Sequence, residues 1–329
     1  MAEIVEGGRR LARAFRQTEY DTRVPRPKLM SMRDAVARFV PDGASICMGT
    51  ALEALIPFAA GHELIRQRRR DLTLIGPISD ILFDQLIGAS CVRRVIAAWV
   101  GNVSAGLGYN YRRAVEQRVP VALEVEDHSN LTIAFALQAA ALGVPYLPTR
   151  SLLGTGLPQS NPTFKAAVDP WSGTPLLLVP AIAPDVAILH VQRADEEGHA
   201  HVWGTLGVTR PAALAAKRVI IVAEEIRPRA RILSDPGLVL TPALKVAAVV
   251  HEPWGAFPSP VQGYYGRRHD FYHRFHEESR TTEGFQRWLA QWVHGVADWT
   301  AFLSRLDAGV LDAIRVTHSL PSEPLDYGA

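Results

Sequence analysis

Short apolar runs alternate with segments of helical periodicity along most of this chain. Runs rich in β-branched residues and bounded by Gly, Pro or Asp predict buried strands at residues 44–49, 72–76, 92–100, 121–125, 186–191, 219–222 and 246–250. Apolar positions at helical spacing predict helices at residues 35–40, 53–69, 80–87, 109–117 and 131–142, with others that begin at residues 209 and 267. Because strands that alternate with helices build βαβ units, we expect an α/β fold with a mainly parallel sheet flanked by helices and followed by C-terminal helices.

Residues 179–204 carry a clear strand pattern and a group of histidines. An apolar run is followed, after a polar turn, by alternating polar and apolar residues, which predicts a buried strand and a half-buried return strand. His190, His199 and His201 lie close together here. They are typical either of a metal site or of strand histidines that hydrogen-bond nearby backbone. We favour the second interpretation, because no cysteine or helical histidine pair completes a ligand set.

Three stretches lack such periodicity. Residues 1–28 are charged and end in a proline-containing segment, which predicts an extension ahead of the folded domain. Residues 150–173 are rich in Gly, Pro and Ser and predict a long irregular loop, of a kind that is often functional. Residues 251–266 predict a second such loop. The aromatic residues that follow at helical spacing, from Phe271 to Phe302, are typical of a core or a subunit interface.

The composition is that of an ordinary soluble enzyme. Hydrophobic residues make up 48% and charged residues 21%, and the formal net charge of +2 gives no reason to expect nucleic-acid binding. No signal peptide and no apolar run of about 18 residues is recognisable, so we expect a cytoplasmic protein without a membrane span. Cys47 and Cys91 lie in apolar runs and are typical of buried small hydrophobes. The local basic residues belong to the polar end of a predicted helix: Arg66, Arg68, Arg69 and Arg70.

Small and polar residues follow four of the predicted strands. In parallel α/β sheets ligands bind beyond the carboxyl ends of the strands, where small residues let a ligand approach the backbone and free N–H groups suit a carboxylate or phosphate. The candidate binding residues are Gly49, Thr50, Gly76, Ser79, Asn102, Ser104, Ser129 and Asn130. Each turn alone is also explained as an ordinary connection, whereas four on one edge favour a site. Dinucleotide, Walker and G-x-S-x-G motifs are absent from the sequence.

Several segments, in a fixed order, resemble one protein family. Class I coenzyme A transferases, in the A (alpha) subunit of the glutaconate CoA-transferase branch, have a segment similar to VPAIAPDVAILHVQRADEEGHAHVWG. The same subunits carry, in the same order, counterparts of MSMRDAVARFVPDGASICMGT, DLTLIGPISDILFDQLIGAS and VRRVIAAWVGNVSAGLGYNYRRAVE. The resemblance extends over about residues 30–306. It predicts an extension at 1–29, an alpha-type domain at 30–310 and a tail at 311–329, with the fold that CoA transferases share with sugar isomerases.

The resemblance implies covalent catalysis on coenzyme A thioesters, which are substrates and not permanently bound cofactors. From the incomplete ligand set at the histidines we expect no metal. In these enzymes the thioester is attacked by a glutamate of the B-type (beta) chain, from the loop that corresponds to Gly76-Pro77-Ile78-Ser79. This stretch has no glutamate. We therefore expect an A-type (alpha) chain that is inactive alone and acts with a B-type partner of similar fold. It would supply binding surface through Thr50, Asn102, Ser104, Ser129 and Asn130.

Two other interpretations stay open. Some relatives are ring-opening hydrolases of steroid degradation that use an acidic residue of the A-type chain, and Glu126 and Asp127 occupy the matching loop. Either carboxylate is equally explained as a helix cap or an arginine partner. The same architecture also serves sugar-phosphate isomerases and non-enzymatic acyl-CoA sensors. Candidates for holding a distal carboxylate of the acyl group are Arg112, Arg113 and Arg150.

Overall fold

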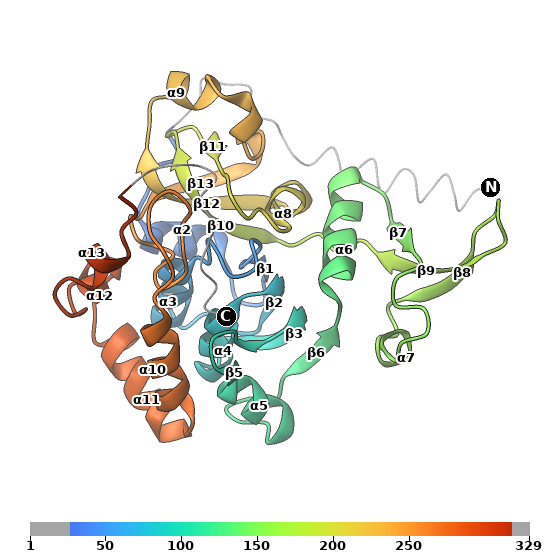
Figure 1. Cartoon of the computed structure of the whole chain (residues 1–329), viewed down its shortest axis with the longest axis horizontal. Coiled ribbons are helices and arrows are strands. Elements are labelled where there is room, and N and C mark those ends of the chain that lie inside the picture. The colour runs from blue at the N-terminus through green and yellow to red at the C-terminus, as the bar shows by residue number, and fades with distance from the viewer. Residues whose placement is uncertain (1–26, 318–329) are drawn as a thin grey trace.

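An eight-stranded sheet forms the centre of the structure, a computed structural model that describes residues 27–317 (Figure 1). The strands lie in the order β13-β12-β10-β1-β2-β3-β6, and all neighbours along this path are parallel. Strand β11 pairs antiparallel with β10. The strands are β1 Ser45–Cys47, β2 Leu72–Ile78, β3 Val92–Trp99, β6 Glu124–Asp127, β10 Val186–Ala194, β11 Ala200–His201, β12 Arg218–Ile226 and β13 Val246–His251. The predicted mainly parallel sheet is confirmed.

Helices cover both faces of this sheet. Successive residues of a strand point to opposite faces, so Ile46 belongs to one buried apolar cluster and Cys47 to the other. The helices of the first cluster are α2 Met32–Phe39, α3 Phe58–Arg66, α4 Asp80–Gly88 and α5 Tyr109–Glu116. Those of the second are α6 Asn130–Leu142 and α8 Thr209–Ala215. The core is therefore split into two layers by the sheet, as expected for βαβ units.

The C-terminal helices complete the first layer. They are α10 His269–Ser279, α11 Thr282–Leu289, the π-helical turn Ala290–His294, α12 Trp299–Leu303 and α13 Val310–Ile314. The aromatic residues of the predicted stripe are buried in the same cluster as α3 and α4, so the stripe belongs to the core of this chain. At the other end, Leu29 bridges to Val249 of β13. The expected start of the tail at residue 311 falls inside α13.

Residues 144–180 fold differently from the prediction. The expected long loop at 150–173 contains helix α7 Leu157–Ser160 and strand β8 Lys165–Val168. Strand β8 pairs with β9 Pro175–Pro180, which pairs with β7 Tyr146–Thr149, in an antiparallel sheet. In Figure 1 this small sheet lies on the outer side of α6, to one side of the main body. The strands were missed because they are short and their boundaries are dense in Pro and Gly, which the pattern assigns to loops.

Three other boundaries correct the prediction. The helix expected from residue 53 begins at Phe58, because Leu52 and Leu55 have positive φ and Pro57 lies at the N-cap. The fourth strand spans Glu124–Asp127 and not 121–125, which places Glu126 in the strand itself. A hairpin, β4 Gly101–Asn102 and β5 Gly106–Leu107, follows β3. The remaining elements are α9 Arg229–Leu233 and two 3-10 turns, Pro236–Leu238 and Ala243–Lys245.

Other local predictions hold. Ser31 caps α2 by accepting a hydrogen bond from the Asp34 backbone N–H. Cys47 and Cys91 are free and buried, as expected for small apolar residues. None of the helices between residues 27 and 317 has the length and apolar character required to cross a bilayer.

Candidate active site at the carboxyl edge of the sheet

The turns that follow β1 and β2 are packed directly against each other. Gly49 has φ +64°, and a Cβ there would lie 2.0 Å from Ser79 Oγ. The Ser79 hydroxyl donates a hydrogen bond to the Met48 carbonyl oxygen at 3.0 Å. A Cβ on Gly76 would lie 2.6 Å from that same oxygen. The two glycines therefore let the turn after β1 contact the carboxyl end of β2, and this packing role explains them without a bound ligand.

Three of the candidate side chains are buried and have partners within the chain. Thr50 Oγ1 lies 2.8 Å from Thr209 Oγ1. Asn102 Nδ2 donates to the Tyr272 carbonyl oxygen at 2.8 Å, and Asn102 Oδ1 accepts from the Ser104 N–H. Together with Ser79, these side chains belong to the buried packing at the carboxyl edge of the sheet. Their role in binding stays a prediction.

A buried ion pair lies beside these turns. Arg267 Nη2 donates to Asp80 Oδ2 at 2.5 Å, and neither side chain is exposed to solvent. Asp80 Oδ1 accepts from the Val103 N–H, and Asp80 has φ +45°. A non-glycine residue in this region of the backbone costs about 1–3 kcal/mol and persists only where its surroundings hold it, typically at functional sites. Burial raises the pKa of Asp80, and Arg267 opposes that effect.

The guanidinium group of Arg267 has several contacts, but not all of its N–H donors have an acceptor. Nη2 also donates to Ser104 Oγ at 2.9 Å, and the ring of Tyr272 lies 3.7 Å from Cζ. Nε and Nη1 are buried without a hydrogen-bond partner among residues 27–317. Glu53 Oε2 is also buried without a hydrogen-bond partner among these residues. Burial raises the pKa of Glu53, the charge of Arg267 lowers it, and the charge of Asp80 raises it. Buried donors of Arg267 and a buried acceptor of Glu53, all without a hydrogen-bond partner in the described chain, thus lie near the carboxyl ends of the first three strands.

Glu126 is ion-paired within the chain. Arg94 Nη2 donates to Glu126 Oε2, and His128 Nε2 lies 2.9 Å from Oε1. The hydrogen bond with His128 is the main cause that holds the pKa of Glu126 below its ordinary value, and Arg94 adds to it. A general base at neutral pH needs a pKa raised toward 7. The arrangement therefore favours the arginine-partner interpretation of Glu126.

Asp127 points to the other face of β6. A cavity of about 480 Å³ lies there, and its lining includes Asp127, Trp99, Tyr111 and Arg112. The Asp127 carbonyl oxygen accepts from Asn161 Nδ2 at 2.8 Å. Both residues lie in strand β6 and not in the expected loop. Because adjacent residues of a strand face opposite ways, Glu126 and Asp127 are two separate candidates.

Ser129 and Asn130 lie apart from the other candidates. Ser129 is the N-cap of α6, where its hydroxyl accepts from the Thr132 N–H at 3.1 Å. Asn130 is exposed at the first position of that helix. Both follow β6, at the end of the sheet, whereas Gly49, Ser79 and Asn102 lie around β1, β2 and β3.

The histidines of the 179–204 segment each have a partner. His190 Nε2 lies 2.7 Å from Glu224 Oε1, and His199 Nδ1 lies 2.8 Å from Asp195 Oδ2. His201 Nε2 lies 2.6 Å from the Ile232 carbonyl oxygen. Among residues 27–317, no group of three His, Cys, Asp or Glu side chains is arranged to hold a metal ion.

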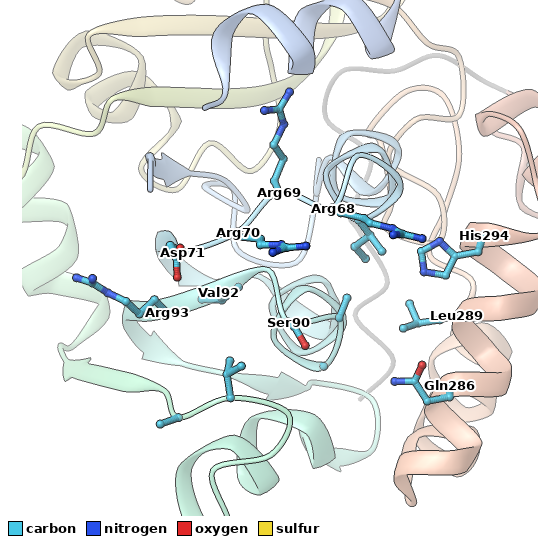
Figure 2. Close-up of a pocket in the computed structure, with 15 residues that line it drawn as sticks. Arg68, Arg69, Arg70, Asp71, Ser90, Val92, Arg93, Gln286, Leu289 and His294 are labelled. Carbon is cyan, nitrogen blue, oxygen red and sulfur yellow. The ribbon is translucent and has the colours of Figure 1, made fainter. Parts of the chain in front are cut away.

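A basic hollow of about 510 Å³ lies at the opposite, amino end of the strands. Figure 2 shows the guanidinium groups of Arg68 and Arg70 turned into it, with Arg68 beside His294 and Arg69 pointing away. Burial, with help from Arg68, lowers the pKa of His294. These arginines follow the C-terminus of α3, where the helix dipole favours cations. The hollow contains none of the predicted binding residues.

No signal in the sequence indicates the pairing of Asp80 with Arg267. The two residues are 187 positions apart. Asp80 is typical of an acidic residue in the first turn of a helix, and Arg267 of the start of the C-terminal helices. Only the fold brings them to the same edge.

The chain is similar to known proteins over nearly its whole length. A family model described as coenzyme A transferase matches residues 29–252. The A-type chain of the 3-oxoadipate CoA-transferase of Pseudomonas knackmussii is 38% identical, over 86% of this chain and 99% of its own. The A-type chain of the glutaconate CoA-transferase of Acidaminococcus fermentans is 32% identical, over 89% of this chain and 96% of its own.

Structure and a more distant relative agree with these matches. A chain of the crystal structure of the Acidaminococcus enzyme superposes with a TM-score of 0.83, over 89% of this chain and 97% of that chain. The IpdA subunit of a cholesterol ring-cleaving hydrolase of Mycobacterium tuberculosis is 26% identical, over 85% of this chain and 98% of its own.

Proposed function

The chain belongs to the coenzyme A transferase family, as a transferase subunit of the A type, and we propose that it moves coenzyme A between an acyl-CoA and a carboxylic acid together with a B-type subunit. The observation that carries this proposal is the identity of 38% and 32% to two transferase chains of the A type, over nearly their full lengths. Each of those relatives is named as one subunit of its enzyme, which supports a partner for this chain as well.

The reaction needs a nucleophile that this chain lacks at the expected place. The stretch Gly76-Pro77-Ile78-Ser79 forms the carboxyl end of β2 and the residue after it, and it contains no glutamate. In our proposal a glutamate carboxylate of the partner attacks the thioester carbonyl, forms a mixed anhydride and releases the CoA thiolate. The thiolate then attacks the glutamyl carbonyl of the anhydride, which gives a glutamyl-CoA thioester and the free acid. An acceptor carboxylate reverses the two steps, so the bonds and charges balance.

Exposed apolar surface supports a partner chain. Strand β6 is the last of the parallel sheet, and parallel strands are normally covered on both faces. Val125 on this strand is nevertheless 37% exposed. Helix α6 is apolar on all sides, yet Leu131 is 42% and Leu142 is 61% exposed. A helix without a polar face is normally buried, so these surfaces suit a second subunit.

A ring-opening hydrolase is the second candidate, because one relative has that name. The geometry at Glu126 favours the transferase. A base that abstracts a proton needs a free carboxylate, and Glu126 is bound by Arg94 and His128. Asp127 stays available to a hydrolase reaction, since it borders a cavity. A sensor or an isomerase has no support from these relatives.

The test is co-expression with the product of the neighbouring reading frame, where we expect the B-type chain, followed by a thioester-exchange assay over a panel of acids. We expect exchange by the complex and none by either chain alone. Exchange by the isolated A-type chain would refute the shared site, and thioester hydrolysis without exchange would favour the hydrolase.

We place the enzyme in the cytoplasm, where free thiols such as Cys47 and Cys91 stay reduced.

A further inference from the structure

We propose that the basic hollow at the amino end of the strands binds a small molecule with a pyrophosphate group, held mainly by Arg68 and Arg70. The hollow has a volume of about 510 Å³, which lies within the range of pockets that hold small-molecule ligands. Both arginines are exposed to solvent, so a ligand can reach them. The inference does not rest on the proposed transferase activity, because it uses other residues of the chain.

Positive charge dominates the lining of the hollow. Four arginines line it, and Asp71 is the single carboxylate among the described lining residues. Figure 2 shows Arg68 and Arg70 directed into the hollow. Partial burial lowers the pKa of His294, and the charges of Arg68 and Arg66 lower it further, as positive charge without a counterion does to a neighbouring histidine. A ligand with more than one negative charge would supply the missing counterion.

The two arginines that point into the hollow have no role in holding the chain together. Within residues 27–317 their side chains have neither a hydrogen-bond acceptor nor a carboxylate partner. Arg69 between them differs, because its Nη2 donates to the Ala37 carbonyl oxygen at 3.4 Å and to Gln67 Oε1 at 2.9 Å. The guanidinium groups of Arg68 and Arg70 therefore keep the planar fork of N–H donors that matches two phosphate oxygens.

Strained backbone places several of the side chains around the hollow. Arg68 has φ +55°, Asp71 has φ +55° and Ser90 has φ +62°. Arg68 and Ser90 each follow the C-cap residue of a helix, α3 and α4 respectively. Glycine is the usual residue at this position, because it adopts positive φ without steric cost. A chain that keeps side chains there accepts strain, which is typical of binding sites.

The rest of the lining suits the remainder of such a ligand. Ser90 and Gln286 supply neutral hydrogen-bonding groups, and Ile65, Val121 and Leu289 supply apolar surface. In Figure 2 Gln286 and Leu289 face the hollow from α11. Apolar walls with a few polar and charged groups are the usual form of a small-molecule site. A nucleoside diphosphate has both parts, since its pyrophosphate suits the arginines and its ring system suits the apolar wall.

The same pyrophosphate group occurs in free nucleotides and in coenzyme A. Strand β2, Leu72–Ile78, begins beside the hollow and ends at the small-residue turns, and six steps of about 3.3 Å make it about 20 Å long. None of the residues predicted to bind the thioester lies in the hollow. We therefore take a free nucleotide as the ligand and ADP as the probe.

The experiment is a calorimetric titration of ADP into the full-length chain, alone and in complex with its B-type partner. For the wild type we expect saturable binding in both. Arg68→Gly removes the guanidinium group and also relieves the positive φ, so this variant should unfold at no lower temperature than the wild type. Its dissociation constant for ADP should be at least about tenfold higher, because charge-assisted hydrogen bonds to phosphate are lost. Arg70→Gln should weaken binding to a similar extent.

Arg118→Gly is the matched control. Arg118 is also exposed, has φ +60° and follows the C-cap residue of α5, but it does not line the hollow. The control loses the same charge and gains the same glycine, so its affinity for ADP should equal that of the wild type. ADP should raise the Tm of the wild type and of Arg118→Gly, but not that of Arg68→Gly. This contrast separates a site in the hollow from a general attraction of anions to a basic protein.

Three results would overturn the proposal. The first is the absence of ADP binding to the wild type, and the second is a wild-type affinity in both Arg68→Gly and Arg70→Gln. The third is binding by the chain alone that is lost in the complex, because the hollow would then be a contact between subunits. Coenzyme A is titrated in parallel, and we expect Arg68→Gly to leave its affinity unchanged. An equal loss for both ligands would support the pyrophosphate site, with coenzyme A as the source of the pyrophosphate.

Discussion

Replacing Gly49 with alanine tests how the carboxyl edge is built. A Cβ at this position would lie 2.0 Å from Ser79 Oγ and 2.6 Å from Ser79 Cβ, both far inside van der Waals contact. Ser79 cannot withdraw without losing its hydrogen bond to the Met48 carbonyl oxygen. It also cannot move independently of the next residue, Asp80, which is paired with the buried Arg267. We therefore expect Gly49→Ala to destabilise the fold and to disturb the ion pair.

Two effects add to the free-energy cost. An alanine in the left-handed region costs about 1 kcal/mol relative to glycine. Overpacking a buried position costs about 1–3 kcal/mol more. The sum is about 2–4 kcal/mol, and for a large domain 1 kcal/mol moves Tm by about 2–4 °C. The melting temperature should therefore fall by about 4–16 °C.

Gly43→Ala is the matched control. Gly43 has φ +77°, like Gly49 in sign, but no atom lies within 4 Å of a Cβ built there. It should show only the backbone cost of about 1 kcal/mol. Thermal and urea unfolding of both variants, followed by circular dichroism, give the comparison. An equal loss of stability in the two variants would show that Ser79 moves aside without cost. The predicted overpacking cost at Gly49 would then be refuted.

Three further outcomes follow from single groups. Glu126→Gln should lower the free energy of unfolding by about 1–3 kcal/mol at pH 7. The loss should be smaller near pH 4, because interactions that depress the pKa of Glu126 stabilise the fold only above the unfolded-state pKa and are lost as pH falls. Urea titrations at both pH values check this. Burial raises the pKa of Glu252 to about 7, so the stability it contributes is present below the unfolded-state value and lost as pH rises through about 7; Glu252→Gln should flatten that part of the pH–stability curve. Burial raises the pKa of the Cys47 thiol to about 12, so a thiol reagent at pH 8 should label it only after unfolding, as mass spectrometry of native and urea-treated protein will show.

Local signals account for the parts of the fold that were predictable. The cap at Ser31 and the αL residue Gly143 that ends α6 are set by neighbours in the sequence. The parallel sheet follows from the alternation of strands and helices. The segment at 144–180 was missed because its strands are short, lie between Pro and Gly, and are stabilised by pairing with one another, which no local pattern shows.

The site was only partly predictable for the same reason. Gly49, Ser79 and Asn102 were proposed because turn residues after parallel strands are a local signal. Their contacts, however, are with other parts of the chain, and these contacts bury the side chains that looked available. Sequence spacing placed Glu126 and Asp127 together, whereas the pleat of β6 separates them. Burial and side-chain direction depend on the assembled fold, so a set of polar turn residues overstates what a ligand can touch.

The carboxyl edge of the sheet leaves few side-chain groups free for chemistry. Almost all of its polar groups are used inside this chain: Thr50 by Thr209, Ser79 by Met48, and Asn102 by Tyr272. A nucleophile needs a free, reactive atom, and none of these groups has one. The polar atoms left without a partner in the described chain, on Arg267 and Glu53, are buried and so are not open to a thioester. In the proposed reaction we therefore expect the carboxylate that forms the covalent intermediate to come from a B-type partner.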